Sequence, residues 1–171
     1  VVKSKASKVL RSRTTIQVGA EIFGDSSIEA ELESIKLMLN SLKISGVQSI
    51  TLSLGHAGFT ASVLEPFKSL GKEIFSNIET ALSKKSKSDL MAIIPDNHES
   101  KSSLINLCNM YGKKDVLKIA KTEYSNIKNS DNLLDHLEKV VTELEDFTKV
   151  NLHIDLGEIQ GFKYHNGIVF S

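Results

Sequence analysis

Three runs along the chain alternate apolar with polar residues: residues 14–24, 47–54 and 151–156. In the last of these, Leu152, Ile154 and Leu156 share one side of an extended chain. Strict alternation is typical of a strand with one buried face. A fourth apolar run at residues 168–170 begins another strand. Glycines at 157, 161 and 167 separate the last two runs, which leaves open an ordinary glycine-bearing hairpin.

Helical spacing of apolar residues follows the first run. Residues 25–46 repeat apolar side chains every three or four positions, which predicts a helix that Asp25 or Ser26 caps and that Gly46 ends. Residues 57–70 predict a second helix, which Pro66 must kink or restart. From residue 71 to residue 150 the pattern is wholly helical, and its clearest amphipathic stretch lies at residues 133–144.

This order of elements predicts an α+β fold in two parts. Residues 1–57 and 148–171 form a sheet core, and residues 58–147 form a helical insertion. The chain begins with Val1 rather than Met and stops directly after strand-forming residues. We therefore expect a fragment of a longer polypeptide.

Composition narrows the function classes. Among 171 residues, 21 are Lys or Arg and 21 are Asp or Glu, so the formal net charge is zero, which argues against wholesale binding to nucleic acid or membranes. The one cysteine, Cys108, forms no internal disulfide and has no metal-type Cys/His cluster beside it, so we expect a small buried side chain. No signal peptide or membrane-spanning run is visible, no cofactor or metal is predicted, and we expect a cytoplasmic protein.

Polar residues at two places are candidates for a site. On a strand at residues 14–24, Gln17, Gly19 and Glu21 share one face, which makes a floor for a small polar ligand. A solvent-facing strand with a polar face is an equally good interpretation. His56 lies between glycines at a strand end, where its side chain can reach a site, although a lone histidine there is more often structural.

Two separated motifs resemble one family. Residues 17–24 read Gln-Val-Gly-Ala-Glu-Ile-Phe-Gly and resemble the Gln-x-Gly-x-Glu-x-x-Gly strand of histidyl-tRNA synthetases and their catalytically silent relatives. Residues 160–167 read Gln-Gly-Phe-Lys-Tyr-His-Asn-Gly and resemble that family's second histidine-binding motif, typically Arg-Gly-x-x-Tyr-Tyr-x-Gly. The resemblance covers residues 13–58 and 150–171 well and the insertion poorly. It implies a class II synthetase-like antiparallel sheet with flanking helices.

Further motifs are similar to one branch of this family, the regulatory subunits of ATP phosphoribosyltransferase. Residues 52–59 contain the Leu-Gly-His-x-Gly segment of that branch, and residues 155–159 read Asp-Leu-Gly-Glu-Ile. Tyr164 and His165 replace the Tyr-Tyr of the synthetases, and Tyr-His is common in the regulatory branch. The resemblance therefore favours a regulatory subunit.

The resemblance also implies roles for particular residues. In a synthetase, positions Gln17 and Glu21 contact the amino group and imidazole of histidine, and positions Tyr164 and His165 line the same pocket. Candidate supporting residues are Gly19, His56, Gln160 and Gly161. Gln160 stands where synthetases carry an arginine that steadies the reacting carboxylate and phosphate. Because a neutral amide supplies no positive charge to a developing pentavalent phosphate, adenylation is not expected, and no residue is assigned a catalytic role.

The function that the resemblance implies is regulation in the first step of histidine biosynthesis. Such a subunit binds the short catalytic subunit of ATP phosphoribosyltransferase as a hetero-oligomer, activates it and makes it responsive to histidine. One alternative is a fragment of a histidyl-tRNA synthetase that activates histidine and charges tRNA. Another is a tRNA-interaction module, against which the neutral charge argues weakly.

Overall fold

The computed structural model describes residues 18–145, 147, 150–159 and 167–171. The chain divides into two compact units, residues 1–47 and residues 48–171. The predicted division into a sheet core, residues 1–57 and 148–171, and an insertion, residues 58–147, stays a prediction. In the described part of the chain no helix is both long and apolar enough to cross a membrane.

The first unit contains helix α1, Ile28–Ile44, where the apolar spacing predicted it. Ser27 is the N-cap, one residue beyond the predicted candidates, and its side chain accepts a hydrogen bond from the Ala30 N–H at 3.3 Å. Asp25 supports this cap by accepting from the Ser27 N–H at 2.9 Å. Gly46 follows the helix with a φ of 88°, the left-handed geometry that a glycine adopts without strain.

The strand predicted at residues 14–24 is wrong for its described part. Residues 18–24 form no strand, and Val18 and Phe23 are 98% and 84% exposed. The alternating pattern is present, but a strand is stabilised by hydrogen bonds to a neighbouring strand. None of the described strands pairs with this segment. Gly19 and Glu21 therefore do not share the face of a sheet here.

The second unit is built on a four-stranded sheet with the order β2-β3-β1-β4. Strand β1 (Ile50–His56) pairs in parallel with β3 (Val150–Asp155), and β4 (Ile168–Phe170) pairs antiparallel with β1 on its other side. Because β3 and β4 flank β1, they do not form the hairpin that the glycine-rich sequence left open. The alternation predicted for β1 is confirmed, since Leu52 and Leu54 are buried and Thr51 is exposed.

The sheet is mixed rather than purely antiparallel. All of α2 to α7 lie in the sequence between β1 and β3, and a crossover of that length is what a parallel pair requires. The flanking helices are α2 (Ala57–Leu64), a 3₁₀ helix (Glu65–Leu70), α3 (Lys72–Ser83), α4 (Lys87–Ile93), α5 (Lys101–Leu107), α6 (Asp115–Glu123) and α7 (Ser130–Glu145). Pro66 stands in the first turn of the 3₁₀ helix, which is the predicted restart.

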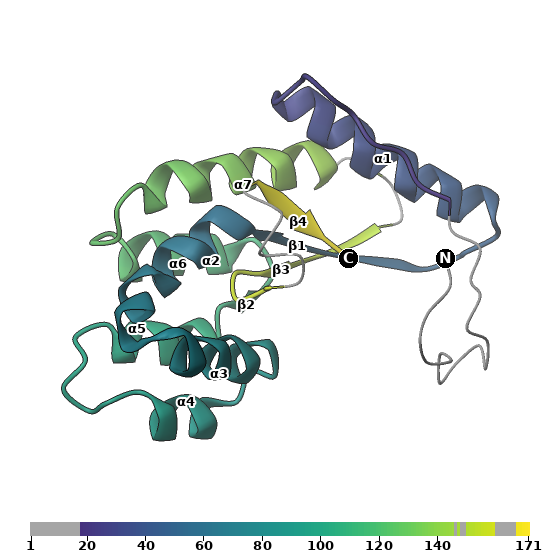
Figure 1. The fold of residues 1–171 in the computed structure, drawn as a ribbon. Helices are drawn as coiled ribbons and strands as arrows, with labels where there is room; N and C mark the ends of the chain where they lie inside the picture. Colours follow the sequence, from purple (N-terminus) through teal and green to yellow (C-terminus); the bar gives the residue numbers. More distant parts are fainter. Residues whose placement is uncertain (1–17, 146, 148–149, 160–166) are drawn as a thin grey trace, which may run out of the picture. The chain divides into compact units, whose positions relative to one another are not determined.

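Helices α2, α6 and α7 lie beside the sheet, and α3, α4 and α5 gather together next to them (Figure 1). The core between them is apolar and closely packed. Phe59 and Tyr124 meet edge to face with ring centroids 5.3 Å apart, and the buried Tyr124 hydroxyl donates to the Ser103 carbonyl at 2.9 Å. Burial raises the pKa of Cys108, so its thiol stays protonated and packs as the small hydrophobic side chain that was expected.

One strand lies where only helices were predicted. Strand β2, Tyr111–Gly112, pairs antiparallel with the end of β3 at the edge of the sheet. The Leu156 N–H extends this pairing by donating to the Met110 carbonyl at 2.9 Å. A strand of two residues is too short to show any periodicity, so only the tertiary pairing defines it.

Candidate functional site

The residues predicted for the histidine pocket fall in two groups. Gln17, Gln160, Gly161, Tyr164 and His165 lie outside the described residues. Gly19 and Glu21 are described, and both are exposed in an irregular segment of the first unit. Of the predicted residues that the structure describes, His56 is the one that lies in the second unit.

His56 ends β1 and begins α2. Its side chain is the N-cap of that helix, because Nδ1 accepts hydrogen bonds from the N–H groups of Gly58 at 3.1 Å and Phe59 at 3.4 Å. This explains the glycine-flanked histidine of the sequence: the chain turns sharply from strand to helix, and the imidazole satisfies the first backbone donors. Only 2% of His56 is exposed.

The other ring nitrogen of His56 contacts a residue that the sequence did not single out. His56 Nε2 lies 3.2 Å from Nδ1 of His136, on α7, and the two rings meet edge to face. Since Nδ1 of His56 accepts two backbone hydrogen bonds, the neutral ring carries its proton on Nε2 and donates it to His136. Burial, with a smaller effect of His136, lowers the pKa of His56 to about 4.

The first turn of α2 also holds both ends of the segment that connects β3 to β4. The buried Thr60 hydroxyl lies 2.9 Å from the Leu156 carbonyl and 3.3 Å from the Glu158 carbonyl, just after β3. The Ala57 N–H donates to the Gly167 carbonyl at 2.9 Å, just before β4. The β1–α2 junction therefore fixes where the chain leaves β3 and where it returns, on either side of residues 160–166.

A partly buried ion pair lies at the end of β3. Lys85, between α3 and α4, places its Nζ 2.6 Å from Oδ1 of Asp155. The same carboxylate oxygen accepts a hydrogen bond from the Gly157 N–H at 2.9 Å. The helical part of the chain thus contacts the end of β3 through a charged side chain.

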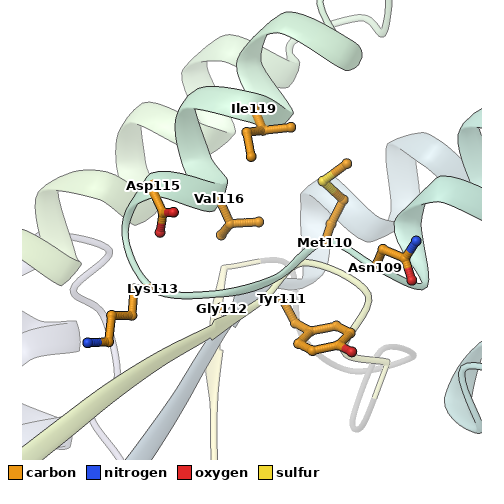
Figure 2. Close-up of a pocket in the computed structure, with 8 residues that line it drawn as sticks. All are labelled: Asn109, Met110, Tyr111, Gly112, Lys113, Asp115, Val116 and Ile119. Carbon is orange, nitrogen blue, oxygen red and sulfur yellow. The ribbon is translucent and has the colours of Figure 1, made fainter.

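A surface pocket of about 310 Å³ lies between the segment around β2 and helix α6. Figure 2 shows Met110, Val116 and Ile119 on the side of α6, and Tyr111 on the opposite side of the segment. Asn109, Gly112, Lys113 and Asp115 complete its lining. Neither Gly19, Glu21 nor His56, the predicted site residues that the structure describes, lines this pocket. Among the described residues, no three His, Cys, Asp or Glu side chains are grouped to hold a metal ion.

Sequence reasoning singled out His56, whose part in a ligand site stays a prediction, and did not single out Thr60, Lys85, His136 or Asp155. Thr60 directly follows the motif at residues 52–59, and Asp155 begins the motif at residues 155–159, so the position of each was a usable signal. His136 sits on the amphipathic helix among leucines, and Lys85 sits in a lysine run that reads as a solvated loop. Neither carried a signal that distinguished it.

Known proteins are similar to this chain over most of its length. The ATP phosphoribosyltransferase regulatory subunit of Burkholderia cenocepacia (strain HI2424) is 34% identical over 161 residues, covering 94% of this chain and 41% of that protein. A protein of the same name from Hydrogenovibrio crunogenus is 31% identical over 179 residues, covering 100% of this chain and 45% of that protein. The chain thus spans less than half the length of these relatives.

Two solved structures share the fold. One, an ATP phosphoribosyltransferase regulatory subunit/histidyl-tRNA synthetase from Bacillus halodurans, matches with a TM-score of 0.67 and 23% identity over 86% of this chain and 39% of that chain. The other, the ATP phosphoribosyl transferase (HisG:HisZ) complex from Thermotoga maritima, matches with a TM-score of 0.61 and 15% identity over 86% of this chain and 52% of that chain. These matches confirm the synthetase-like α+β fold.

The relatives also confirm the resemblance that the motifs around residues 17–24, 52–59 and 160–167 indicated. A family model described as Histidyl-tRNA synthetase matches residues 1–171. Because that match runs from the first residue to the last, this chain belongs to the histidyl-tRNA synthetase family.

Proposed function

We propose that this chain is part of a non-catalytic regulatory subunit of ATP phosphoribosyltransferase. The subunit binds the short catalytic subunit, activates it and gives it histidine feedback control in the first step of histidine biosynthesis. The observation that carries this proposal is the name shared by relatives that are 30–34% identical over 94–100% of this chain. A solved complex with the same fold, described as HisG:HisZ, supports a protein partner.

The sequence of the second motif supports a regulatory rather than a catalytic role. Position 160 is glutamine and position 165 is histidine, where synthetases carry arginine and tyrosine. Without the arginine charge, a developing phosphate charge is not stabilised at that position. The chain then keeps a ligand-binding fold and lacks the group needed to adenylate histidine.

Regulation requires that histidine distinguish two states of the complex. A ligand shifts an equilibrium only by the difference between its affinities for the two states. By linkage, the substrates of the catalytic subunit must then alter the affinity for histidine. We assign histidine binding to positions 160, 164 and 165 because residues 160–167 resemble the second histidine-binding motif of the synthetases.

The test uses the complete protein and a short catalytic ATP phosphoribosyltransferase. We expect the mixture to form a larger species by light scattering, with phosphoribosyl transfer that rises on mixing and falls when histidine is added. A mixture that stays as separate species, with activity unchanged by the subunit, contradicts the proposal.

The second candidate function is that of a histidyl-tRNA synthetase fragment, which the description of the family model favours. ATP–pyrophosphate exchange separates the two candidates. We expect no histidine-dependent exchange by the complete protein. Restoring arginine and tyrosine with Gln160→Arg and His165→Tyr is the matched control for the role of these two positions.

A further inference from the structure

The surface pocket beside β2 combines an apolar floor with two opposite charges. Met110 and Val116 are each 6% exposed, and Ile119 is 51% exposed; the three gather on the side of α6 (Figure 2). Lys113, just before α6, and Asp115, the first residue of that helix, line the same pocket with exposed side chains. Its volume of about 310 Å³ is large enough for a small molecule.

The two charged side chains of the pocket have no ion-pair partner among the described residues. The lysines on the α7 side of the same helix differ in this respect, because Lys114 and Lys121 both bond carboxylates of α7. One cation, Lys113, and one anion, Asp115, are therefore left at the pocket. This pair of charges complements a ligand that carries one carboxylate and one ammonium group.

The backbone of β2 adds a donor and an acceptor at the same place. This strand is at one edge of the described sheet. The Leu156 N–H bonds the Met110 carbonyl, and Tyr111 lies opposite Asp155 in the antiparallel register. Because alternate residues of an antiparallel pair bond the neighbouring strand, the N–H and C=O of Tyr111 point away from β3. The Tyr111 side chain lies on the other side of the segment, so its backbone borders the pocket (Figure 2).

We propose that this pocket binds a free α-amino acid with an apolar side chain. The carboxylate of the ligand accepts from Lys113 and from the Tyr111 N–H, and its ammonium group donates to Asp115 and to the Tyr111 carbonyl. Its side chain covers the apolar floor. This site goes beyond the proposed function and does not depend on it, since it contains none of the residues of the motif at residues 160–167.

The same chemistry sets the selectivity of the pocket. Met110, Val116 and Ile119 offer no hydrogen-bonding group on their side chains, so a polar ligand side chain loses hydration there without compensation. An aliphatic side chain gains by leaving water. We therefore expect L-leucine to bind more tightly than L-histidine.

Nuclear magnetic resonance of the complete protein, with labelled methionine and isoleucine methyl groups, tests the site. L-leucine at millimolar concentration is expected to shift the methyl signals of Met110 and Ile119 and to leave that of Ile74, which lies on α3, unchanged. L-leucinamide lacks the carboxylate and N-acetyl-L-leucine lacks the ammonium group. Each should bind roughly threefold more weakly, because each loses one exposed ion pair. Absence of shifts with L-leucine, or equal binding of L-histidine, would overturn the proposal.

Two variants assign the charges. Lys113→Met should weaken L-leucine roughly threefold and leave L-leucinamide unchanged, because the amide has no carboxylate to lose. Asp115→Asn should weaken L-leucine by a similar factor and leave N-acetyl-L-leucine unchanged. Lys118→Met is the matched control, since this exposed lysine of α6 does not line the pocket. Unchanged affinity of both pocket variants for L-leucine would contradict the assignment.

The outcome is separable from that of the proposed function. If L-leucine shifts the two methyl signals while the complete protein fails to assemble with the catalytic subunit, the proposed function is wrong and the amino-acid site stands. If the complex assembles and responds to histidine but L-leucine shifts neither signal, the site is wrong and the proposed function stands.

Discussion

His56 Nε2 and His136 Nδ1 lie 3.2 Å apart, joining the β1–α2 junction to helix α7 across 80 residues of sequence. The tautomer of the pair follows from the cap, because Nδ1 of His56 accepts from the Gly58 N–H. One imidazole thus performs two tasks: it caps α2, and it ties that cap to α7. Because Thr60 and Ala57 of the same helix bond residues at both ends of the β3–β4 connection, the histidine pair and these two ends contact one helix, α2.

Replacing His56 should separate these two tasks. We expect His56→Ala to lower the free energy of unfolding by about 2 kcal/mol, since it removes both the cap and a buried contact. His56→Asn keeps a side-chain acceptor at the N-cap and should recover about half of that loss. Urea denaturation measures the free energy of unfolding of both variants. Equal losses for the two would show that the cap contributes nothing.

The lowered pKa of His56 predicts that stability depends on pH. Burial and His136 lower the pKa of His56 from its ordinary value of 6.5 to about 4. The unfolded chain therefore takes up this proton first as the pH falls. The contribution of the neutral His56 side chain to stability is complete above pH 6.5 and is lost between pH 6.5 and about pH 4. Below about pH 4 this contribution changes no further.

Unfolding curves at a series of pH values, with wild type and His56→Asn compared, isolate this effect. Between pH 6.5 and about pH 4 the wild type should lose stability faster than the variant, by at most about 1.4 kcal/mol per pH unit. Groups distant from His56 contribute equally to both proteins, so they cancel in the difference. Parallel curves would contradict the assignment of this proton uptake to His56.

The parts of the fold that local pattern determines were predictable. Leu52 and Leu54 on β1, and Leu134 and Leu137 on α7, lie buried as their spacing indicated. The predictions that failed concern pairing between segments that are distant in sequence. Residues 18–24 carry a strand pattern without a pairing strand among those described, and β2 is a strand through its pairing with β3 alone.

The candidate site divides in the same way. His56 carried a local signal, a histidine between glycines at the end of a strand. His136 and Lys85 become informative only when the fold brings them to His56 and Asp155, and those contacts span 80 and 70 residues. No local property of a helix face or a lysine run encodes a partner so distant in sequence.

Gly55 should tolerate no side chain. A Cβ there would lie 2.6 Å from the Asp155 carbonyl oxygen and 3.2 Å from Cγ2 of Val169, so both neighbouring strands would have to move. We expect Gly55→Ala to lower the free energy of unfolding by about 2 kcal/mol. Gly19→Ala is the control, since nothing lies within 4 Å of its added Cβ. A destabilisation by Gly19→Ala as large as that by Gly55→Ala would contradict the steric explanation.

Lys101 closes the end of α4 with its ammonium group. Nζ donates to the carbonyls of Met91 at 2.9 Å and Ile94 at 2.6 Å and to Oδ1 of Asp96 at 2.7 Å. The lysine side chain is only 13% exposed, whereas that of Asp96 is fully exposed. The carbonyl contacts therefore carry most of the stabilisation, because solvent screens the ion pair.

Lys101→Met retains most of the apolar part of the side chain and removes its three hydrogen bonds. We expect it to lower the free energy of unfolding by about 2 kcal/mol, because hydrogen bonds from a charged donor to helix-end carbonyls are lost together. Asp96→Asn should change stability little, and so should Lys118→Met, the same substitution at an exposed lysine. Urea denaturation of the three variants decides the question. A loss in Asp96→Asn equal to that in Lys101→Met would assign the effect to the ion pair instead of the carbonyls at the end of α4.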